Sequence, residues 1–105
     1  KLHPKFTPFK AAVFPLLKNK PELVKKAEEI YADLRKEFNV AFDDRGNIGK
    51  RYYSQDEIGT PFGITCDFQT LEDSTVTVRD RDTMKQERVK VSELKSYIQN
   101  ALQKN

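Results

Sequence analysis

The sequence contains few of the residues on which many protein sites depend: one cysteine, one histidine, four glycines and no tryptophan. A single cysteine, Cys66, cannot form a disulfide within the chain, which fits a reducing compartment and predicts a cytoplasmic protein. One histidine and one cysteine cannot supply the usual ligand set of a zinc site, so no metal site is expected. None of the glycines is spaced to cradle a nucleotide phosphate.

Membrane and export signals are also missing from the sequence. No apolar run approaches the ~20 residues that a transmembrane helix needs, and no signal-peptide pattern opens the chain. We therefore expect no membrane partner.

The composition that is present is typical of one polar globular domain. Of the 105 residues, 37% are hydrophobic and 33% are charged, which predicts a single domain over 1–105. The formal net charge of +3 permits contact with a polyanion but does not require it. Residues 1–9, "KLHPKFTPF", contain two prolines that favour an extended backbone. We expect them to form a tether that enters the domain from a larger protein.

The first half of the chain predicts a βαβ unit. Residues 10–17, "KAAVFPLL", are continuously apolar after Lys10, which is typical of a strand that is buried on both faces. Asn19 and Pro21 then give the chemistry of a helix start. The helix carries one apolar stripe, and alternating apolar residues at 38–42 indicate a second strand, parallel to the first. The stripe consists of Leu23, Ala27, Ile30 and Leu34.

Beyond the second strand, the pattern predicts a short helix and a further strand. A turn cluster at 43–49 leads into a helix over 50–58, which Gly59 ends. A strand is expected over 62–69, in which alternate residues face the core. These core residues are Phe62, Ile64, Cys66 and Phe68. Cys66 is therefore expected to be a buried structural thiol rather than a nucleophile.

The last part of the chain predicts a hairpin and a helix. Residues 75–79 and 87–91 alternate between apolar and polar, and a polar linker joins them. Ser92 is expected to cap the last helix. The inner face of this helix would consist of Leu94, Ile98, Ala101 and Leu102. The fold class is therefore α/β, with a five-stranded mixed sheet and about three helices.

Catalytic chemistry is not indicated. The chain has no nucleophile elbow, no glycine-rich phosphate loop and no pair of histidines. His3 lies in the expected tether. Asp43 and Asp44 could in principle ligate a hard cation, but adjacent acids in a turn are commonly turn formers. We predict no catalytic residue and no bound cofactor in this chain.

Three stretches carry a resemblance to a known family: "DDRGNIGKRYYSQDEIGTPF" (43–62), "TVTVRDRDTMKQERV" (75–89) and "VFPLLKNKPELV" (13–24). They closely resemble the C-terminal anticodon-binding domain of dimeric, class II glycyl-tRNA synthetases of bacterial type. The resemblance implies the three-layer α/β fold shared by the domains for glycine, threonine, proline and histidine. It also implies that ATP and Mg²⁺ act in a missing N-terminal catalytic domain, from which the tether over 1–9 comes.

The same resemblance implies the partner. A fragment of this kind is expected to bind the anticodon loop of glycine tRNA, to be monomeric alone and to belong to a homodimeric enzyme. Glycine anticodons carry two cytosines. The N4 amine of cytosine donates a hydrogen bond that a carboxylate accepts well. Tyr52 or Tyr53 could stack on an unpaired base. The candidate readers are Asp56, Glu57 and Glu72.

A structural role for the carboxylates is the alternative. Asp56 or Glu57 could instead pair with an arginine and orient it, the candidates being Arg51, Arg79 and Arg81. Cations are expected at strand ends, where α/β sheets gather ligands. These cations are Arg45, Lys50, Arg51, Arg79 and Arg81. By the resemblance to the threonine domain, Arg79 is the leading base-contacting residue. Three cations further along are equally explained as solvated edge charges, namely Lys85, Arg88 and Lys90.

Two other classes of protein remain as alternatives. One is an accessory or protein-interaction module with the same fold, as in the accessory subunit of the mitochondrial DNA polymerase. The other is a small redox or nucleotide-binding α/β protein. A single cysteine predicted to be buried, and the absence of a phosphate loop, argue against the second alternative.

Overall fold

The computed structural model describes residues 9–43 and 60–103. Most of the expected tether and the helix predicted over 50–58 lie outside these ranges. Those two predictions, and the one-domain boundary that includes them, therefore stay predictions.

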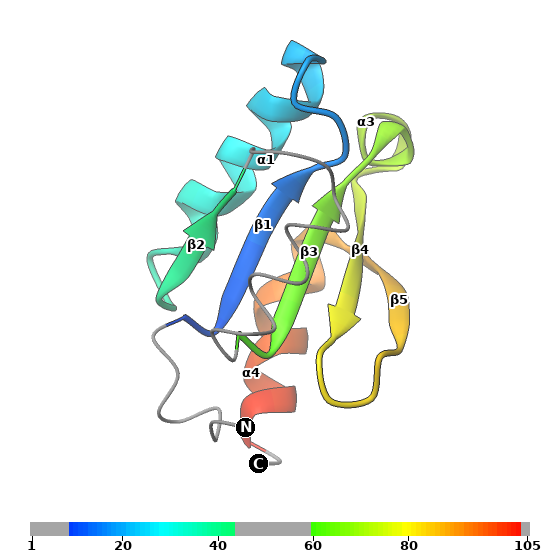
Figure 1. Cartoon of the computed structure of the whole chain (residues 1–105). Coiled ribbons are helices and arrows are strands. Elements are labelled where there is room, and N and C mark those ends of the chain that lie inside the picture. The colour runs from blue at the N-terminus through cyan, green and yellow to red at the C-terminus, as the bar shows by residue number, and fades with distance from the viewer. Residues whose placement is uncertain (1–8, 44–59, 104–105) are drawn as a thin grey trace.

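The first three elements form the predicted βαβ unit (Figure 1). Strand β1, Ala11–Pro15, is buried along its whole length, as its continuous apolar run predicts. Helix α1, Pro21–Leu34, has a proline in its first turn, and its buried residues are those of the predicted stripe. The N-cap is Lys20 rather than Asn19. Strand β2, Val40–Phe42, pairs with β1 in parallel.

All five strands join one mixed sheet in the order β2-β1-β3-β4-β5. Strand β3, Phe62–Cys66, pairs with β1 in parallel. Strand β4, Thr75–Asp80, runs antiparallel to β3, and β5, Gln86–Lys90, runs antiparallel to β4. The predicted sheet and its hairpin are confirmed.

Helix α3, Phe68–Asp73, replaces the end of the strand predicted over 62–69. The Asp67 carboxylate accepts a hydrogen bond from the backbone N–H of Thr70 at 3.1 Å, and the Thr70 hydroxyl accepts one from the backbone N–H of Asp67 at 3.0 Å. This capping box starts a helix where apolar alternation alone would continue the strand. Phe68 lies on α3 with 47% of its surface exposed, so its assignment to the core is wrong.

The last helix is entered through a turn rather than a serine cap. Val91–Glu93 form a 3₁₀ turn that contains Ser92, and α4, Leu94–Gln103, follows it directly. The cap predicted at Ser92 is therefore wrong, because the chain is already turning there. The predicted inner residues of the helix are either buried or pack against the core: Leu94, Ile98, Ala101 and Leu102.

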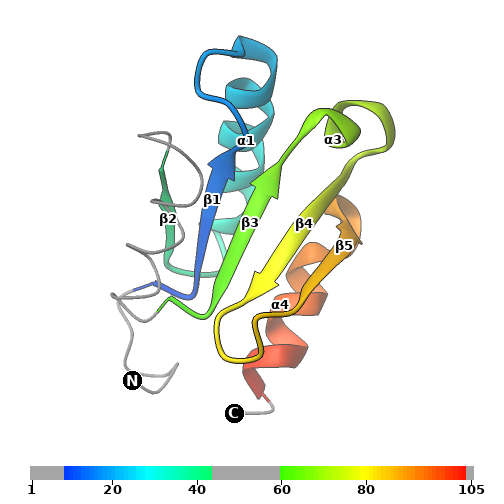
Figure 2. The ribbon, with the colours of Figure 1, turned by 45° about the vertical axis from the view of Figure 1, so that its right-hand side comes forward.

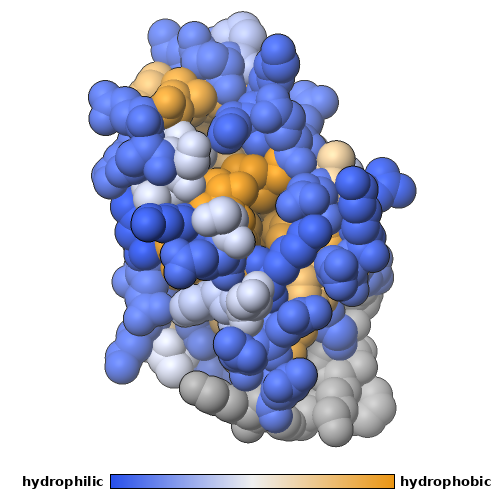
Figure 3. Space-filling view, turned by 180° about the vertical axis from the view of Figure 1, so that it is seen from behind, coloured by the Kyte–Doolittle hydropathy of each residue, from blue (hydrophilic) through white to orange (hydrophobic). Residues whose placement is uncertain are grey.

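Helices α1 and α4 lie on the same face of the sheet (Figure 1 and Figure 2). The core between them and the sheet includes Val13, Ile64, Val78, Ile30 and Ile98. Seen from the helical side, most of the surface is hydrophilic (Figure 3). The α/β fold class is confirmed, and the described residues form two of the three expected layers: the sheet and one helical layer.

Candidate nucleic-acid interface

The structure describes three of the predicted contact residues: Glu72, Arg79 and Arg81. The other seven lie outside the described ranges: Arg45, Lys50, Arg51, Tyr52, Tyr53, Asp56 and Glu57. Their stacking, base-reading and strand-end roles therefore stay predictions. The same holds for the alternative in which a carboxylate orients an arginine.

One face of the β4–β5 hairpin carries cations. Val76 and Val78 are buried toward the helices. Strand alternation therefore places the other residues of this part of β4 on the opposite face, namely Thr75, Thr77 and Arg79. With their partners on β5, those residues form what we call the basic face: Thr75, Thr77, Arg79, Gln86, Arg88 and Lys90. None of these six side chains is acidic. The basic face therefore favours an anionic ligand.

The tip of the β4–β5 hairpin is held by one carboxylate. Asp80 Oδ1 accepts hydrogen bonds from the backbone N–H groups of Asp82 and Thr83, at 2.8 and 3.2 Å. The backbone N–H and C=O of Asp80 bond to the other side of the tip, at 2.9 and 2.8 Å. Aspartate commonly forms turns in this way. These bonds fix the tip and, with it, the end of β4 that carries Arg79.

Arg79 lies on the basic face directly before the hairpin tip. Its partners in the sheet are Gly63 of β3 and Gln86 of β5. Gly63 has no side chain that could cover the arginine from β3. The Nη2 atom of Arg79 lies 3.1 Å from Sδ of Met84. A guanidinium presents its donors as a rigid fork, which suits a base edge or a phosphate. The placement of Arg79 is compatible with the predicted base contact.

Arg81 is buried rather than displayed. Its side chain is 6% exposed, and its Nε and Nη2 atoms donate to Asp82 Oδ1 at 3.2 and 3.0 Å. Its backbone N–H donates to Pro61 C=O at 2.9 Å. These contacts link the hairpin tip to Pro61, directly before β3, so Arg81 lies two residues after Arg79 but not on the basic face.

Glu72 lies far from Arg79. It is exposed on α3, which follows the C-terminal end of β3. Arg79 instead pairs with Gly63, near the N-terminal end of β3. The two residues therefore stand at opposite ends of the sheet (Figure 1), and the structure does not bring them together. One base could not be contacted by both of them.

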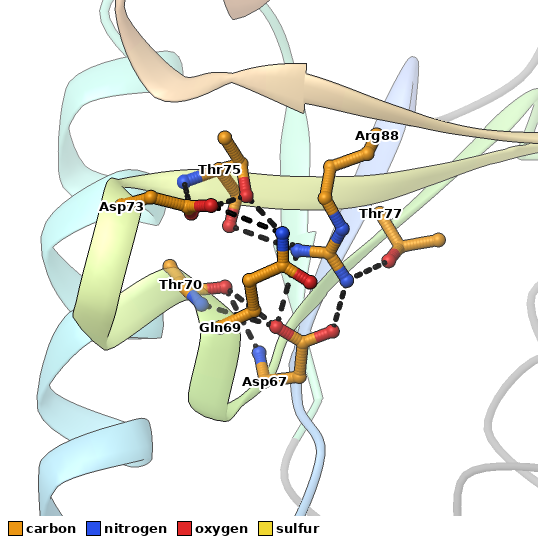
Figure 4. A network of polar contacts seen from close by, with 7 residues as sticks. All are labelled: Asp67, Gln69, Thr70, Asp73, Thr75, Thr77 and Arg88. Atoms are coloured by element: carbon orange, nitrogen blue, oxygen red, sulfur yellow. Dashed lines mark hydrogen bonds and ion pairs between the residues drawn. The ribbon is translucent and has the colours of Figure 1, made fainter.

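Arg88 makes contacts that the sequence pattern does not reveal (Figure 4). Its Nη1 and Nη2 atoms donate to the two carboxylate oxygens of Asp67, the Nη1 bond being 3.2 Å long. Nη1 also donates to the hydroxyl of Thr75 at 3.1 Å, and Nη2 to the hydroxyl of Thr77 at 3.0 Å. The side chain interpreted as an edge charge thus joins β5 to β4 and to the N-terminal end of α3.

The ion pair between Arg88 and Asp67 changes the pKa of both groups. Burial acts to raise the Asp67 pKa, but hydrogen bonds from Arg88 and Thr70 bring it below its ordinary value of 3.8. The hydrogen bond to Asp67 raises the Arg88 pKa. Because Arg88 is paired with the Asp67 carboxylate, the exposed Lys85 and Lys90 are better placed to bind a phosphate.

An open hollow of about 880 Å³ lies between β5 and α4. At its wall, the Tyr97 hydroxyl donates to Glu87 Oε2 at 2.8 Å. Burial and this carboxylate raise the pKa of Tyr97 to about 12, so the phenol is protonated at neutral pH. The hollow is lined by Glu87, Arg88, Val89, Lys90, Glu93, Ser96, Tyr97 and Asn100. Its lining mixes both charge signs and does not include Arg79, although it shares Arg88 and Lys90 with the basic face.

The described parts of the chain hold no metal-binding group, and their one cysteine is buried. Within residues 9–43 and 60–103, no group of three or more His, Cys, Asp or Glu side chains could hold a metal ion. Cys66 is fully buried, as predicted, and burial raises the pKa of its thiol to about 12. A thiol with that pKa is protonated at neutral pH and is a poor nucleophile. None of the helices in the described ranges is long and apolar enough to cross a bilayer.

The chain matches one family over most of its length. The sequence model of the family described as "Anticodon binding domain" covers residues 10–101. Similar curated proteins are named Glycine–tRNA ligase. The protein from Clostridium beijerinckii is 59% identical over 102 residues, which is 97% of this chain and 21% of the relative. The one from Borreliella afzelii is 52% identical over 102 residues, which is 97% of this chain and 23% of the relative.

Solved structures give the same picture of the fold. A crystal structure of prolyl-tRNA synthetase from Cryptosporidium parvum, complexed with halofuginone and AMPPNP, superposes with a TM-score of 0.89 at 27% identity. The match covers 98% of this chain and 22% of that chain. This chain therefore spans about a fifth of the length of the relatives that it matches.

Proposed function

Because the chain belongs to the family of anticodon binding domains, we propose that it recognises the anticodon of glycine tRNA as one domain of a glycine–tRNA ligase. The observation that carries this proposal is the identity of 59% to a Glycine–tRNA ligase over 97% of the chain. The identity to the prolyl-tRNA synthetase is only 27%, although the fold is shared. The sequence therefore favours the glycine enzyme.

In the proposed ligase, catalysis and anticodon binding belong to different parts of the polypeptide. Attachment of glycine to tRNA with ATP and Mg²⁺ would take place in the part of the relatives that this chain does not match. The contribution of this chain would be binding and orientation of the tRNA. We propose that the chain alone is monomeric, that the ligase is a homodimer and that it acts in the cytoplasm.

The chemistry of the anticodon supports the choice of interface. The pairing edge of cytosine has acceptors at O2 and N3 beside the N4 amine donor. Arg79 carries only donors, so it can bond to those acceptors or to a phosphate. Asp56 and Glu57 are the proposed acceptors for the amine, and Tyr52 and Tyr53 the proposed stacking residues.

Lys85 gives a test of phosphate binding. Affinity for glycine tRNA should fall as salt rises, with a logarithmic slope of roughly 0.7 per phosphate contacted in a single-stranded segment. Lys85→Ala removes an exposed cation at the hairpin tip, so the slope should decrease by roughly 0.7. Filter binding over a range of salt concentrations measures both slopes.

A matched control is available on the opposite side of the sheet. Lys25 is exposed on α1, and Lys25→Ala should leave the slope unchanged. Wild-type binding that does not depend on salt would contradict the proposal, since an anticodon loop cannot be bound without approaching its phosphates.

A further inference from the structure

Met84 is an apolar side chain held at the surface of the hairpin tip. It is 60% exposed, compared with 41% for Leu17, 47% for Phe68 and 43% for Leu71. Phe68 and Leu71 lie on α3, at the other end of the sheet. Within the described ranges, Met84 is thus the exposed large apolar side chain beside Arg79.

The backbone at Met84 does not favour methionine. Its φ of 63° lies in the left-handed region, where glycine or asparagine is accommodated at lower cost. The bonds that Asp80 makes to the tip hold the chain in this turn. A glycine would therefore serve the turn better. The turn explains the left-handed backbone conformation of residue 84, but it does not explain why the side chain there is methionine.

The surroundings of Met84 match the chemistry of a nucleotide. Arg79 Nη2 lies 3.1 Å from the Met84 sulfur, and the neighbouring Lys85 is exposed. A nucleotide offers an apolar face, a polar edge and a phosphate. The thioether is polarisable and packs well against aromatic rings. The guanidinium and the ammonium suit the edge and the phosphate.

We propose that Met84 covers the face of an unstacked anticodon-loop base whose edge Arg79 contacts, an inference that rests on the proposed function. Unpaired bases are commonly held between a flat or apolar side chain and hydrogen-bonding groups. The two cations beside Met84, Arg79 and Lys85, favour a nucleic acid over an apolar protein surface as its partner. Met84 would then set the position of the base, and Arg79 would read it.

Substitutions of Met84 separate its side chain from its backbone. Met84→Gly suits the left-handed turn but removes the side chain, so the melting temperature should change little. Its affinity for the anticodon stem-loop of glycine tRNA should fall about tenfold, as expected for one stacked base. Met84→Leu keeps an apolar surface of similar size and should retain most of the affinity. Met84→Asn suits the backbone without an apolar surface and should behave as Met84→Gly does.

The outcomes distinguish this inference from the proposed function. If the wild-type chain binds the stem-loop and Met84→Gly binds equally well, the inference fails while the proposed function stands. If the wild-type chain does not bind the stem-loop, the proposed function itself fails. A stem-loop that lacks the contacted base should be bound equally by the wild type and Met84→Gly. A tenfold difference on that RNA would overturn the base contact.

Discussion

Replacement of Arg79 by alanine should weaken binding of glycine tRNA by about 1–3 kcal/mol, the usual contribution of a good base contact. The reason is the position of Arg79 on the basic face, directly before a hairpin tip that the Asp80 carboxylate fixes. Charging by a full-length ligase that carries this chain should fall by the same factor. Equilibrium binding and aminoacylation kinetics measure the two effects.

Two control variants separate base reading from simple charge. Arg79→Lys keeps the charge but loses the planar fork, so it should recover little of the affinity if Arg79 contacts a base. Lys85→Ala should cost less and should act equally on all tRNAs. The melting temperature of each variant shows whether the fold is intact. Full affinity in Arg79→Lys would instead show that Arg79 meets a phosphate.

Replacement of Asp67 by alanine should lower the free energy of unfolding by about 2–3 kcal/mol. The change removes the N-cap of α3, worth ~1 kcal/mol, and a hydrogen-bonded partner of a charged group, worth ~1.5–3 kcal/mol before screening by solvent. Arg88 would keep its bonds to Thr75 and Thr77 but lose its counter-ion. Urea denaturation measures the loss.

The contribution of Asp67 should depend on pH in a defined direction. Its folded-state pKa is lowered, so the stabilisation is present above the unfolded value of about 3.8 and is lost as the pH falls through the folded value. Asp67→Asn keeps a capping side chain but not the charge. The stability difference between wild type and Asp67→Asn should therefore shrink below pH ~3.8. A difference that stays constant there would show that the ion pair does not stabilise the fold.

Elements with a clear period could be predicted from the sequence. Strand β1 is a continuous apolar run, and α1 has a stripe at helical spacing, so local pattern and packing agree. Helix α3 was missed because Phe68 continues the alternation of β3. Its start depends on the bonds between Asp67 and Thr70, which periodicity does not reveal.

Contacts at the site were harder to predict. Asp67 and Arg88 are 21 positions apart, so no local pattern connects them. A carboxylate directly after a buried strand, with a cation on a later strand, gives only a weak indication of an ion pair. Met84 lay in a stretch interpreted as a polar linker, and its positive φ is set by the Asp80 turn. The strand pattern predicts that Arg79 lies in a strand but not that it contacts a base. That role is implied only by the family resemblance.

The central claim is that this chain reads the anticodon of glycine tRNA, and one competition experiment tests it most directly. The chain is titrated, at one salt concentration, with the anticodon stem-loop of glycine tRNA and with the same RNA in which uracil replaces both anticodon cytosines. Uracil lacks the N4 amine, so our account predicts weaker binding of the altered RNA by about 1–3 kcal/mol for each base that is read. Equal affinity for the two RNAs would mean that the chain does not read the pairing edges of these cytosines, and this result would contradict the claim.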